Sequence, residues 1–349
     1  MAKTSVGLDI GTHSIKVVAL SRGDKSPKLI SLGSIVSPMP GIISDTTADL
    51  EALADSIKKL MTAVKIDEKE VVVALPESKV FTRIIDDLPY LTDSELTSAI
   101  VYVSEEFIPM PLTEVNINWQ VLARADKNNS VSSKSTKTIV LVVASPKKVT
   151  AKYVKVLSMV GLTPKALETE TIAVTRSLVG NNPFSPSTLI IQFGSQTTDF
   201  ATISKGLIWL TRSISSGGLS LTRSLAQHFN FEMSQAEEYK KVYGMRRDQL
   251  EGKVYEILKP ILDIIVGEAK RVIQAYEAKY PADPIKRVVL SGGGAKMPGL
   301  VIYFAENLGL EVQDADPWYF IEKDKDLASK LANDASAYSV AVGLALRED

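Results

Sequence analysis

The chain has no cysteine and only two histidines among its 349 residues. Without thiols it can form no disulfide, thiolate metal site or iron–sulfur cluster, and it has no cysteine nucleophile. The two histidines, His13 and His228, are isolated in the sequence, which argues against a histidine-rich metal centre. We find no order of serine, histidine and acidic residues that indicates a hydrolase triad. The composition excludes thiol chemistry and fits a reducing cytoplasm.

Strong charge and long apolar runs are also missing. The formal net charge is −1, whereas electrostatic nucleic-acid binders are basic overall or carry a basic stripe. The strongest apolar runs, residues 138–144 and 189–193, have the length of strands, and a helix that crosses a bilayer needs about 20 apolar residues. The first residues contain no apolar signal core. We therefore expect a cytoplasmic chain with no nucleic-acid partner and no direct membrane insertion, which reaches a membrane only through a partner.

Strand-like and helix-like segments alternate along the chain, which predicts an α/β protein. Strands are expected at residues 5–10, 15–21, 29–36, 71–75, 83–88, 114–125, 138–144, 188–193, 198–204 and 286–290. Helices are expected at residues 46–64, 92–107, 146–160, 217–229, 234–243, 250–280, 298–308 and 333–347. We expect a bend or interruption near Pro260. The turn formers at 180–187 mark the clearest boundary between two strand-and-helix blocks.

One internal repeat spans that boundary. Residues 8–20, LDIGTHSIKVVAL, align without gaps on residues 191–203, IQFGSQTTDFATI. Each copy is typical of a strand, a turn of the pattern Gly-[Ser/Thr]-x-[Ser/Thr] and a second strand. A duplicated turn, one in each half of the chain, is what a two-lobed protein would use to grip one ligand from both sides.

The turn in the first copy has residue types suited to phosphate. Gly11 lets the backbone approach a bulky anion, the turn's amides and hydroxyls can face its oxygens, and Lys16 adds a positive charge. Asp9, at a strand end, could hold Mg²⁺ through water molecules. The predicted phosphate-binding residues of this copy are Gly11, Thr12, His13, Ser14 and Lys16. An ordinary β-hairpin is the alternative.

The second copy favours the functional interpretation of both turns. Its predicted phosphate-binding residues are Gly194, Ser195, Gln196 and Thr197. A further glycine run, Gly292, Gly293 and Gly294, follows an apolar strand and precedes a helix. Such a run permits close approach to a flat ligand such as adenosine, and glycine is costly to order without a reason. The alternative is a flexible connection; the run lacks the G-x-G-x-x-G spacing, and no P-loop occurs in the chain.

Together these motifs resemble those of the actin-like ATPase superfamily, which also contains the DnaK chaperones and the sugar kinases. Residues 8–20 resemble its first phosphate motif, residues 189–203 its second and residues 288–300 its adenosine motif. Within the superfamily, the chain is identified as a member of the PilM family of type IV pilus assembly proteins, relatives of the cell-division protein FtsA. The length fits that family, and the membrane-targeting tail of FtsA is absent.

The resemblance implies a two-lobed actin-like fold, a duplicated ribonuclease-H-like fold, with an FtsA/PilM-type inserted subdomain. The implied domains are a first lobe at 1–183 with the inserted subdomain at about 81–155, a second lobe at 184–332, and a C-terminal helix at 333–349 that returns to the first lobe. It also implies that Glu237 and Lys240 contact the ribose and adenine, whereas local evidence alone favours a solvated ion pair.

The implied function is an ATP-binding, magnesium-dependent scaffold on the cytoplasmic face of a pilus or secretion machine. It would bind the cytoplasmic N-terminal tail of a PilN-like membrane protein, in a groove between the inserted subdomain and the first lobe, together with other assembly-platform proteins. That partner would place the chain at the inner face of the cytoplasmic membrane. A filament-forming ATPase like FtsA or MreB, which would self-associate, is the main alternative, and a small-molecule kinase has no supporting signature.

The chain departs from the family pattern at one position of the second phosphate motif. Active members begin this motif with an aspartate, and here the residue is Gln192. Glutamine has no charge, so it cannot balance Mg²⁺ or accept a proton from water. Glu170 matches a position where relatives place a water-orienting group, and Asp199 could face either the pocket or solvent. With Gln192 and Glu170 as the predicted catalytic residues, we expect at most slow ATP hydrolysis.

Overall fold

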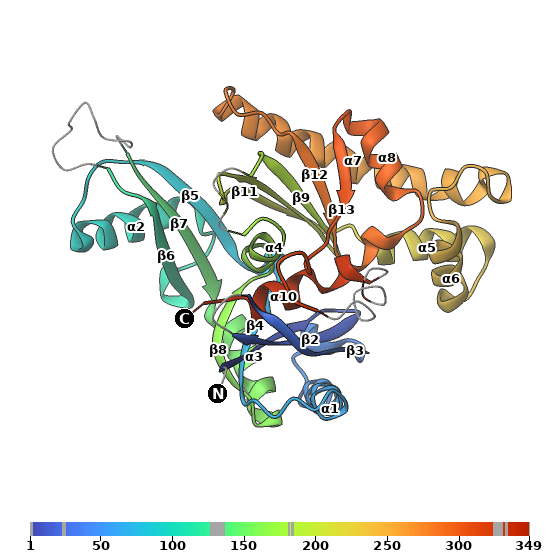
Figure 1. The fold of residues 1–349 in the computed structure, drawn as a ribbon, viewed down its shortest axis with the longest axis horizontal. Helices are drawn as coiled ribbons and strands as arrows, with labels where there is room; N and C mark the ends of the chain where they lie inside the picture. Colours follow the sequence, from blue (N-terminus) through green and yellow to red (C-terminus); the bar gives the residue numbers. More distant parts are fainter. Residues whose placement is uncertain are drawn as a thin grey trace.

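The computed structural model describes residues 3–22, 26–125, 137–180, 182, 185–323, 331 and 334–348. It is a two-lobed α/β fold built on two five-stranded sheets and one three-stranded sheet (Figure 1). The expected boundaries at 183/184 and 332/333 fall outside the described residues, so the limits of the domains stay predictions. In the described part of the chain, no helix combines the length and the apolar character that a membrane span requires.

The first lobe is built on the sheet β3-β2-β1-β4-β8. Its strands are β1 (Lys3–Ile10), β2 (Ser14–Arg22), β3 (Lys28–Val36), β4 (Glu70–Leu75) and β8 (Thr163–Thr169). Strands β1, β2 and β3 are antiparallel, while β4 and β8 run parallel to β1. Five consecutive residues of β4, from Val71 to Leu75, are buried, as expected for a strand that is covered on both faces.

The second lobe repeats this arrangement in the sheet β11-β10-β9-β12-β13. Its strands are β9 (Thr188–Phe193), β10 (Thr198–Ser204), β11 (Leu207–Ile214), β12 (Arg287–Ser291) and β13 (Glu311–Asp314). Again three strands form an antiparallel meander and two run parallel to its first strand. The repeated sequence falls on β1–β2 and on β9–β10, so the two predicted turns occupy equivalent places in the two lobes.

Helices cover the faces of these sheets (Figure 1). They are α1 (Thr47–Ala63), α2 (Asp93–Phe107), α3 (Lys147–Val160), α4 (Glu170–Leu178), α5 (Gly218–Phe229), α6 (Met233–Tyr243), α7 (Lys253–Lys279), α8 (Leu300–Leu308) and α10 (Ser339–Ala345). The first-lobe core is packed by α1 and α3, and the second-lobe core by α5 to α8. Each lobe thus buries its own apolar cluster.

The inserted subdomain leaves the first lobe between β4 and β8. It is the sheet β5-β7-β6, with β5 (Phe81–Leu88), β6 (Val115–Ala123) and β7 (Thr138–Pro146), packed against α2. A reciprocal capping box of Thr92 and Glu95 is present at the start of α2. The chain then returns through α3, whose Tyr153 side chain lies in the first-lobe core.

Two short helices, α4 and α10, lie between the lobes (Figure 1). Glycines permit this close crossing: a Cβ at Gly343 would overlap the carbonyl of Ala173, and a Cβ at Gly7 would overlap the carbonyl of Ala341. Helix α10 therefore packs directly on β1 and on α4.

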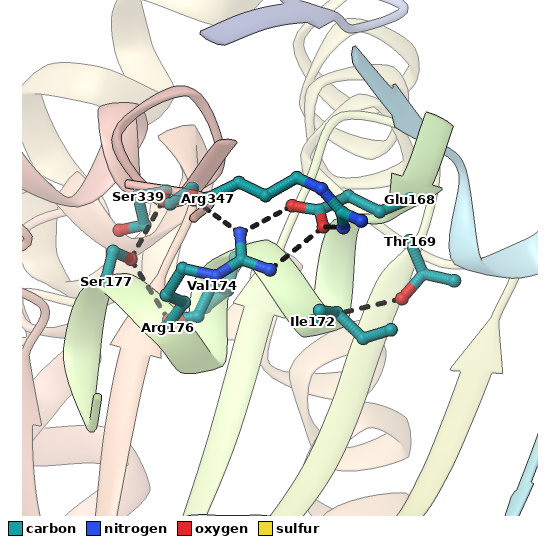
Figure 2. A network of polar contacts seen from close by, with 9 residues as sticks. Glu168, Thr169, Ile172, Val174, Arg176, Ser177, Ser339 and Arg347 are labelled. Atoms are coloured by element: carbon teal, nitrogen blue, oxygen red, sulfur yellow. Dashed lines mark hydrogen bonds and ion pairs between the residues drawn. The ribbon is translucent and has the colours of Figure 1, made fainter. Parts of the chain in front are cut away.

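The buried carboxylate of Glu168 connects α4 to the residue Arg347 that follows α10 (Figure 2). Arg176 donates to both carboxylate oxygens of Glu168, at 2.6 and 2.9 Å, and to the carbonyl of Gly343 at 2.6 Å. Arg347 donates to Glu168 at 2.6 Å from the other side. Bidentate arginine–carboxylate pairs of this kind fix geometry as well as adding energy. The last residues of the chain are thereby anchored to β8.

The structure differs from the sequence-based expectation in three respects. Strands β8, β11 and β13 were not predicted, and all three pair with neighbours that supply much of their stabilisation. Helix α7 continues through Pro260, so the predicted interruption is wrong at the level of helix bounds. The final helix is shorter than predicted, because residues 335–338 form a 3₁₀ turn ahead of α10.

Candidate functional site

The first turn joins β1 to β2. Asp9 and Lys16 are directly opposite in the antiparallel ladder, with Asp9 Oδ2 and Lys16 Nζ 3.8 Å apart. Lys16 Nζ also donates to Ser14 Oγ at 2.7 Å. The Gly11 amide donates to the Ser14 carbonyl at 3.1 Å, and a Cβ at Gly11 would lie 2.8 Å from that oxygen. Glycine is therefore required sterically here, and His13 is exposed at the tip.

The second turn, from β9 to β10, has the same closure. The Gly194 amide donates to the Thr197 carbonyl at 3.0 Å. The start of α5 is fastened to this turn, because the Gly218 amide donates to the Gly194 carbonyl at 3.0 Å. A Cβ at Gly217 would lie 2.7 Å from the Ser195 carbonyl oxygen, so this contact also needs glycine. Ser195, Gln196 and Thr197 remain partly accessible.

Strand register decides where Asp199 lies. It is directly opposite Gln192 in the ladder between β9 and β10, and it is only 4% exposed. Directly opposite residues have side chains on the same face of a sheet. Asp199 is therefore buried beside Gln192, and its side chain does not face solvent. Among the described residues, no group forms a hydrogen bond with the buried Gln192 Oε1.

Four carboxylates influence one another across the two lobes. The pKa of Glu170 is held well above its ordinary value by burial first, and then by the negative charges of Asp199, Asp9 and Glu77. Burial is also the main cause that raises the pKa of Asp199 to about 7. It raises the pKa of Asp9 as well, although Lys16 opposes that shift. Burial and mutual repulsion thus favour the protonated, neutral forms of these acids.

Glu77 is the member of this group that the sequence analysis missed. It follows β4 at the carboxyl end of a parallel strand and is 5% exposed. Burial raises its pKa, against hydrogen bonding from Thr171 and Thr211. A carboxylate directly after a buried strand was the available signal. In the described residues, no three histidine, aspartate or glutamate side chains are placed to ligate a single metal ion.

Lysines of both lobes also come together. Lys296, just after the glycine run, has a lowered pKa because of burial and then of the positive charges of Lys241 and Lys16. Lys16 belongs to the first lobe, and the other two belong to the second. Lys241 and Lys296 were not predicted as site residues, although a lysine next to the glycine run was visible in the sequence. Converging ammonium groups of this kind suit a polyanion.

The three glycines of the run have different surroundings. Gly292 has φ +87°, and a Cβ there would lie 2.5 Å from the Phe193 carbonyl oxygen. A Cβ at Gly294 would lie 2.5 Å from the Phe193 ring, whereas at Gly293 it would meet nothing within 4 Å. Two of the glycines therefore pack against β9, next to the second turn, and only Gly293 borders open space.

Lys240 and Glu237 on α6 are not a solvated ion pair, so that local expectation is wrong. Lys240 is 8% exposed, and its Nζ donates to Glu237 Oε2 at 2.6 Å, Thr222 Oγ1 at 2.8 Å and the Gly218 carbonyl at 3.0 Å. Burial lowers the pKa of Lys240, and Glu237 opposes this shift. Because Gly218 also holds the second turn, this network links α6 to it. Contacts thus connect α6, the second turn and the glycine run.

Comparison with known proteins fits this arrangement. The family model described as "Type IV pilus assembly protein PilM" matches residues 7–349. The chain belongs to this family. A structure of the PilM-PilN type IV pilus biogenesis complex has 25% identity and a TM-score of 0.84, and the match covers 98% of both chains. The family assignment makes this a protein of type IV pilus assembly.

More distant relatives place the fold in the actin-like ATPase superfamily. Cell division protein FtsA of Enterococcus hirae is 24% identical over 352 residues, covering 90% of this chain and 78% of that protein. MreB5 of Spiroplasma citri, solved bound to AMPPNP, has 16% identity and a TM-score of 0.54, with 98% and 95% of the two chains covered. Both agree with the predicted fold, and the second shows the fold alone.

Proposed function

We propose that this PilM-family chain is an ATP-binding scaffold that links a pilus assembly machine to the cytoplasmic tail of a PilN-like protein. The observation that carries the nucleotide half of this proposal is the pair of equivalent glycine-closed turns, one in each lobe, together with the electrostatic interaction of Lys16 in the first lobe with Lys296 in the second. A triphosphate is the ligand that fits such charges together with exposed turn amides. The MreB5 structure, with its bound AMPPNP, supports the same choice.

ATP would lie between the lobes. The turns that begin at Gly11 and Gly194 would meet the phosphates, aided by Lys16 and Lys296, and Gly293 borders the space for the base. Glu237 and Lys240 would contact the ribose and adenine of the nucleotide. Asp9 would hold Mg²⁺ through waters, which suits a buried carboxylate that lacks two close acidic or histidine neighbours in the described residues. When bound, Mg²⁺ would neutralise developing phosphate charge.

The residues near the phosphates favour slow hydrolysis. Gln192 is neutral and cannot accept a proton from the attacking water. Glu170, whose pKa is raised, is a poor base while it holds a proton. ATP would then act as a structural ligand that stabilises the closed arrangement of the lobes by mass action. This stabilisation would organise the binding surface for the partner.

The partner half of the proposal rests on the similarity to the PilM-PilN complex across 98% of both chains. We place the PilN-like tail in a groove between the inserted subdomain and the first lobe. A tail anchored in the cytoplasmic membrane would hold this chain at its inner face, next to other proteins of the assembly platform.

Two binding measurements test the proposal. Fluorescent ATP should bind the purified chain more tightly with Mg²⁺ than without it. A synthetic peptide with the N-terminal cytoplasmic sequence of the PilN from the same genome should retain the chain on beads, and a scrambled peptide should not. Failure of either binding would contradict that half of the proposal. ATP-dependent pelleting without peptide binding would favour the filament-forming alternative.

A further inference from the structure

The inserted subdomain touches the second lobe through a small polar clasp. Asp86, on β5, accepts a hydrogen bond from Lys279 Nζ at 2.9 Å and another from the Tyr280 hydroxyl at 2.5 Å. These partners lie 193 and 194 residues further along the chain, at the carboxyl end of α7. The Asp86 side chain is 19% exposed. Burial would raise the pKa of Asp86, but the bonds to Lys279 and Tyr280 outweigh it and lower the pKa.

In the second-lobe half of the clasp, the Tyr280 ring is packed against other aromatic side chains. The Tyr280 ring packs on Trp209 of β11, with ring centres 4.7 Å apart, and on Tyr276 of α7 at 5.2 Å. Lys279 Nζ lies 5.6 Å from the Tyr280 ring centre. Aromatic contacts of this kind fix ring orientation. The Tyr280 hydroxyl is therefore presented to Asp86 from a packed ring, and the more exposed Lys279 side chain reaches Asp86 beside it.

The inserted-subdomain half lies at an irregular point of its strand. The pairing of β5 with β7 shifts register between Ile85 and Leu88, and Asp86 and Asp87 have no partner in that ladder. A break in the ladder lets the strand bend away from its sheet. Here it brings Asp86 to the second lobe, while the neighbouring Asp87 is exposed.

Beside the clasp, a cavity of about 570 Å³ lies between the two bodies, lined by β5 and α2 on one side and by β11 and α7 on the other. Strands β5 and β11 are nevertheless close neighbours. Both β5 and β11 are edge strands, and no ladder joins them in the described residues. Closer to the first lobe, Glu77 bonds with Thr211 of β11 at the point where the chain enters the inserted subdomain. The subdomain therefore meets the second lobe at its base and at the clasp, across a gap that leaves room to move.

We propose that the Asp86–Lys279–Tyr280 clasp couples the position of the inserted subdomain to the closure of the two lobes. The subdomain is covalently part of the first lobe, and the clasp ties it to the second. Closure about a ligand between the lobes then moves the subdomain and changes the groove on its other side. This inference rests on the proposed function, in which that ligand is ATP and that groove holds the partner peptide. Coupling of two binding sites is reciprocal, so the peptide would also change ATP affinity.

The first experiment needs no ligand. Because the chain has no cysteine, Tyr102→Cys on α2 and Ile302→Cys on α8, both at exposed positions, supply one spin-label pair across the gap. Pulsed electron spin resonance should give one narrow distance distribution in the otherwise unchanged chain. Asp86→Ala and Tyr280→Phe should broaden it, and Asp87→Ala, the matched control on the same strand, should not. A distribution that Asp86→Ala leaves unchanged would overturn the proposal whether or not ATP binds.

The second experiment measures coupling. The affinity for the PilN peptide is determined with and without Mg-ATP in the parent, in Asp86→Ala and in Asp87→Ala. We expect about a tenfold change in the parent and in Asp87→Ala, within the usual range for linked sites, and less than about twofold in Asp86→Ala. The double variant Asp86→Lys with Lys279→Asp should restore part of this ATP-dependent change in peptide affinity. If the parent binds ATP and peptide normally but shows no coupling, the proposed role of the clasp is wrong. If the parent does not bind them, the proposed function is wrong.

Discussion

The turns of the two lobes are closed by the same backbone hydrogen bond but carry different charges. In the first lobe, the opposed pair is Asp9 and Lys16, and in the second lobe it is Gln192 and Asp199. The carboxylate lies on the first strand of one hairpin and on the second strand of the other. Duplication has kept the glycine-closed turn while the opposed side chains diverged. The turn's shape and its charges are thus separable properties.

This comparison assigns different roles to the two sides of the site. Under the proposed function, the lysine of the first turn would attract phosphate directly. The second turn carries a buried acid whose pKa is raised to about 7, which would repel an anion when it is ionised. Its structural contribution is the glycine-closed turn and the attachment of α5. The predictions below test whether this difference controls stability, catalysis and binding.

The largest effect is expected where the lobes differ in packing. Gly7 on β1 lies under α10, and the equivalent residue on β9 is the buried Ile190. Gly7→Val should destabilise the fold by at least about 3 kcal/mol, because the helix cannot shift without breaking its contact with α4. Ile190→Val should cost only about 1 kcal/mol. Denaturant unfolding of both variants measures the two values; equal losses would mean that the α10 crossing is not tight.

The next prediction concerns Gln192, which stands in the second turn where the resemblance implies an aspartate. Gln192→Asp should raise single-turnover hydrolysis of bound ATP by about 100-fold, because it adds a charged acceptor beside the phosphates. The parent should turn over more slowly than about 1 s⁻¹. Rapid-quench assays with radiolabelled ATP measure both. A fast parent with no gain in the variant would mean that Asp199 or Glu170 already serves this purpose.

Opposite charges at equivalent positions should give opposite binding effects. Lys16→Met should weaken ATP binding by about 10- to 100-fold, since a charge-assisted contact is lost. Asp199→Asn should leave it unchanged or tighten it in the absence of Mg²⁺, because a nearby negative charge is removed. Calorimetric titration with ATP measures the affinities, and melting temperatures check the fold. The comparison breaks down if both variants weaken binding alike.

The smallest effect concerns the glycine run. Gly293→Val should fold normally, because Gly293 is the one glycine of the run at which a Cβ meets no other atom within 4 Å. The added side chain should enter the space proposed for the base and weaken ATP binding by about tenfold, or about 1.4 kcal/mol. Gly294→Ala should instead lower the melting temperature, since its Cβ would meet the Phe193 ring. Tight ATP binding by a folded Gly293→Val variant would show that the base lies elsewhere.

Local patterns in the sequence predicted much of the fold. The strands expected at 5–10 and 15–21 and the helices expected at 92–107 and 146–160 are all present. The gap-free repeat predicted two equivalent hairpins, and the two sheets confirm them. These features depend on neighbours within a few residues, so sequence spacing is enough to find them. Strands β8 and β13 escaped because their pairing partners are remote in sequence.

The features of the candidate site can likewise be divided into those visible in the sequence and those that depend on the tertiary structure. The sequence by itself determined the residue types: two glycine turns, a lysine, a carboxylate at a strand end and a neutral glutamine where the resemblance implies an acid. Only the tertiary structure decided that Asp199 is buried beside Gln192, that Glu77 and Lys296 join the site, and that Lys240 is enclosed. It alone joined Asp86 to Tyr280. The physical reason is that burial and long-range charge depend on which segments meet, and the meeting of distant segments leaves no periodic signal in the chain.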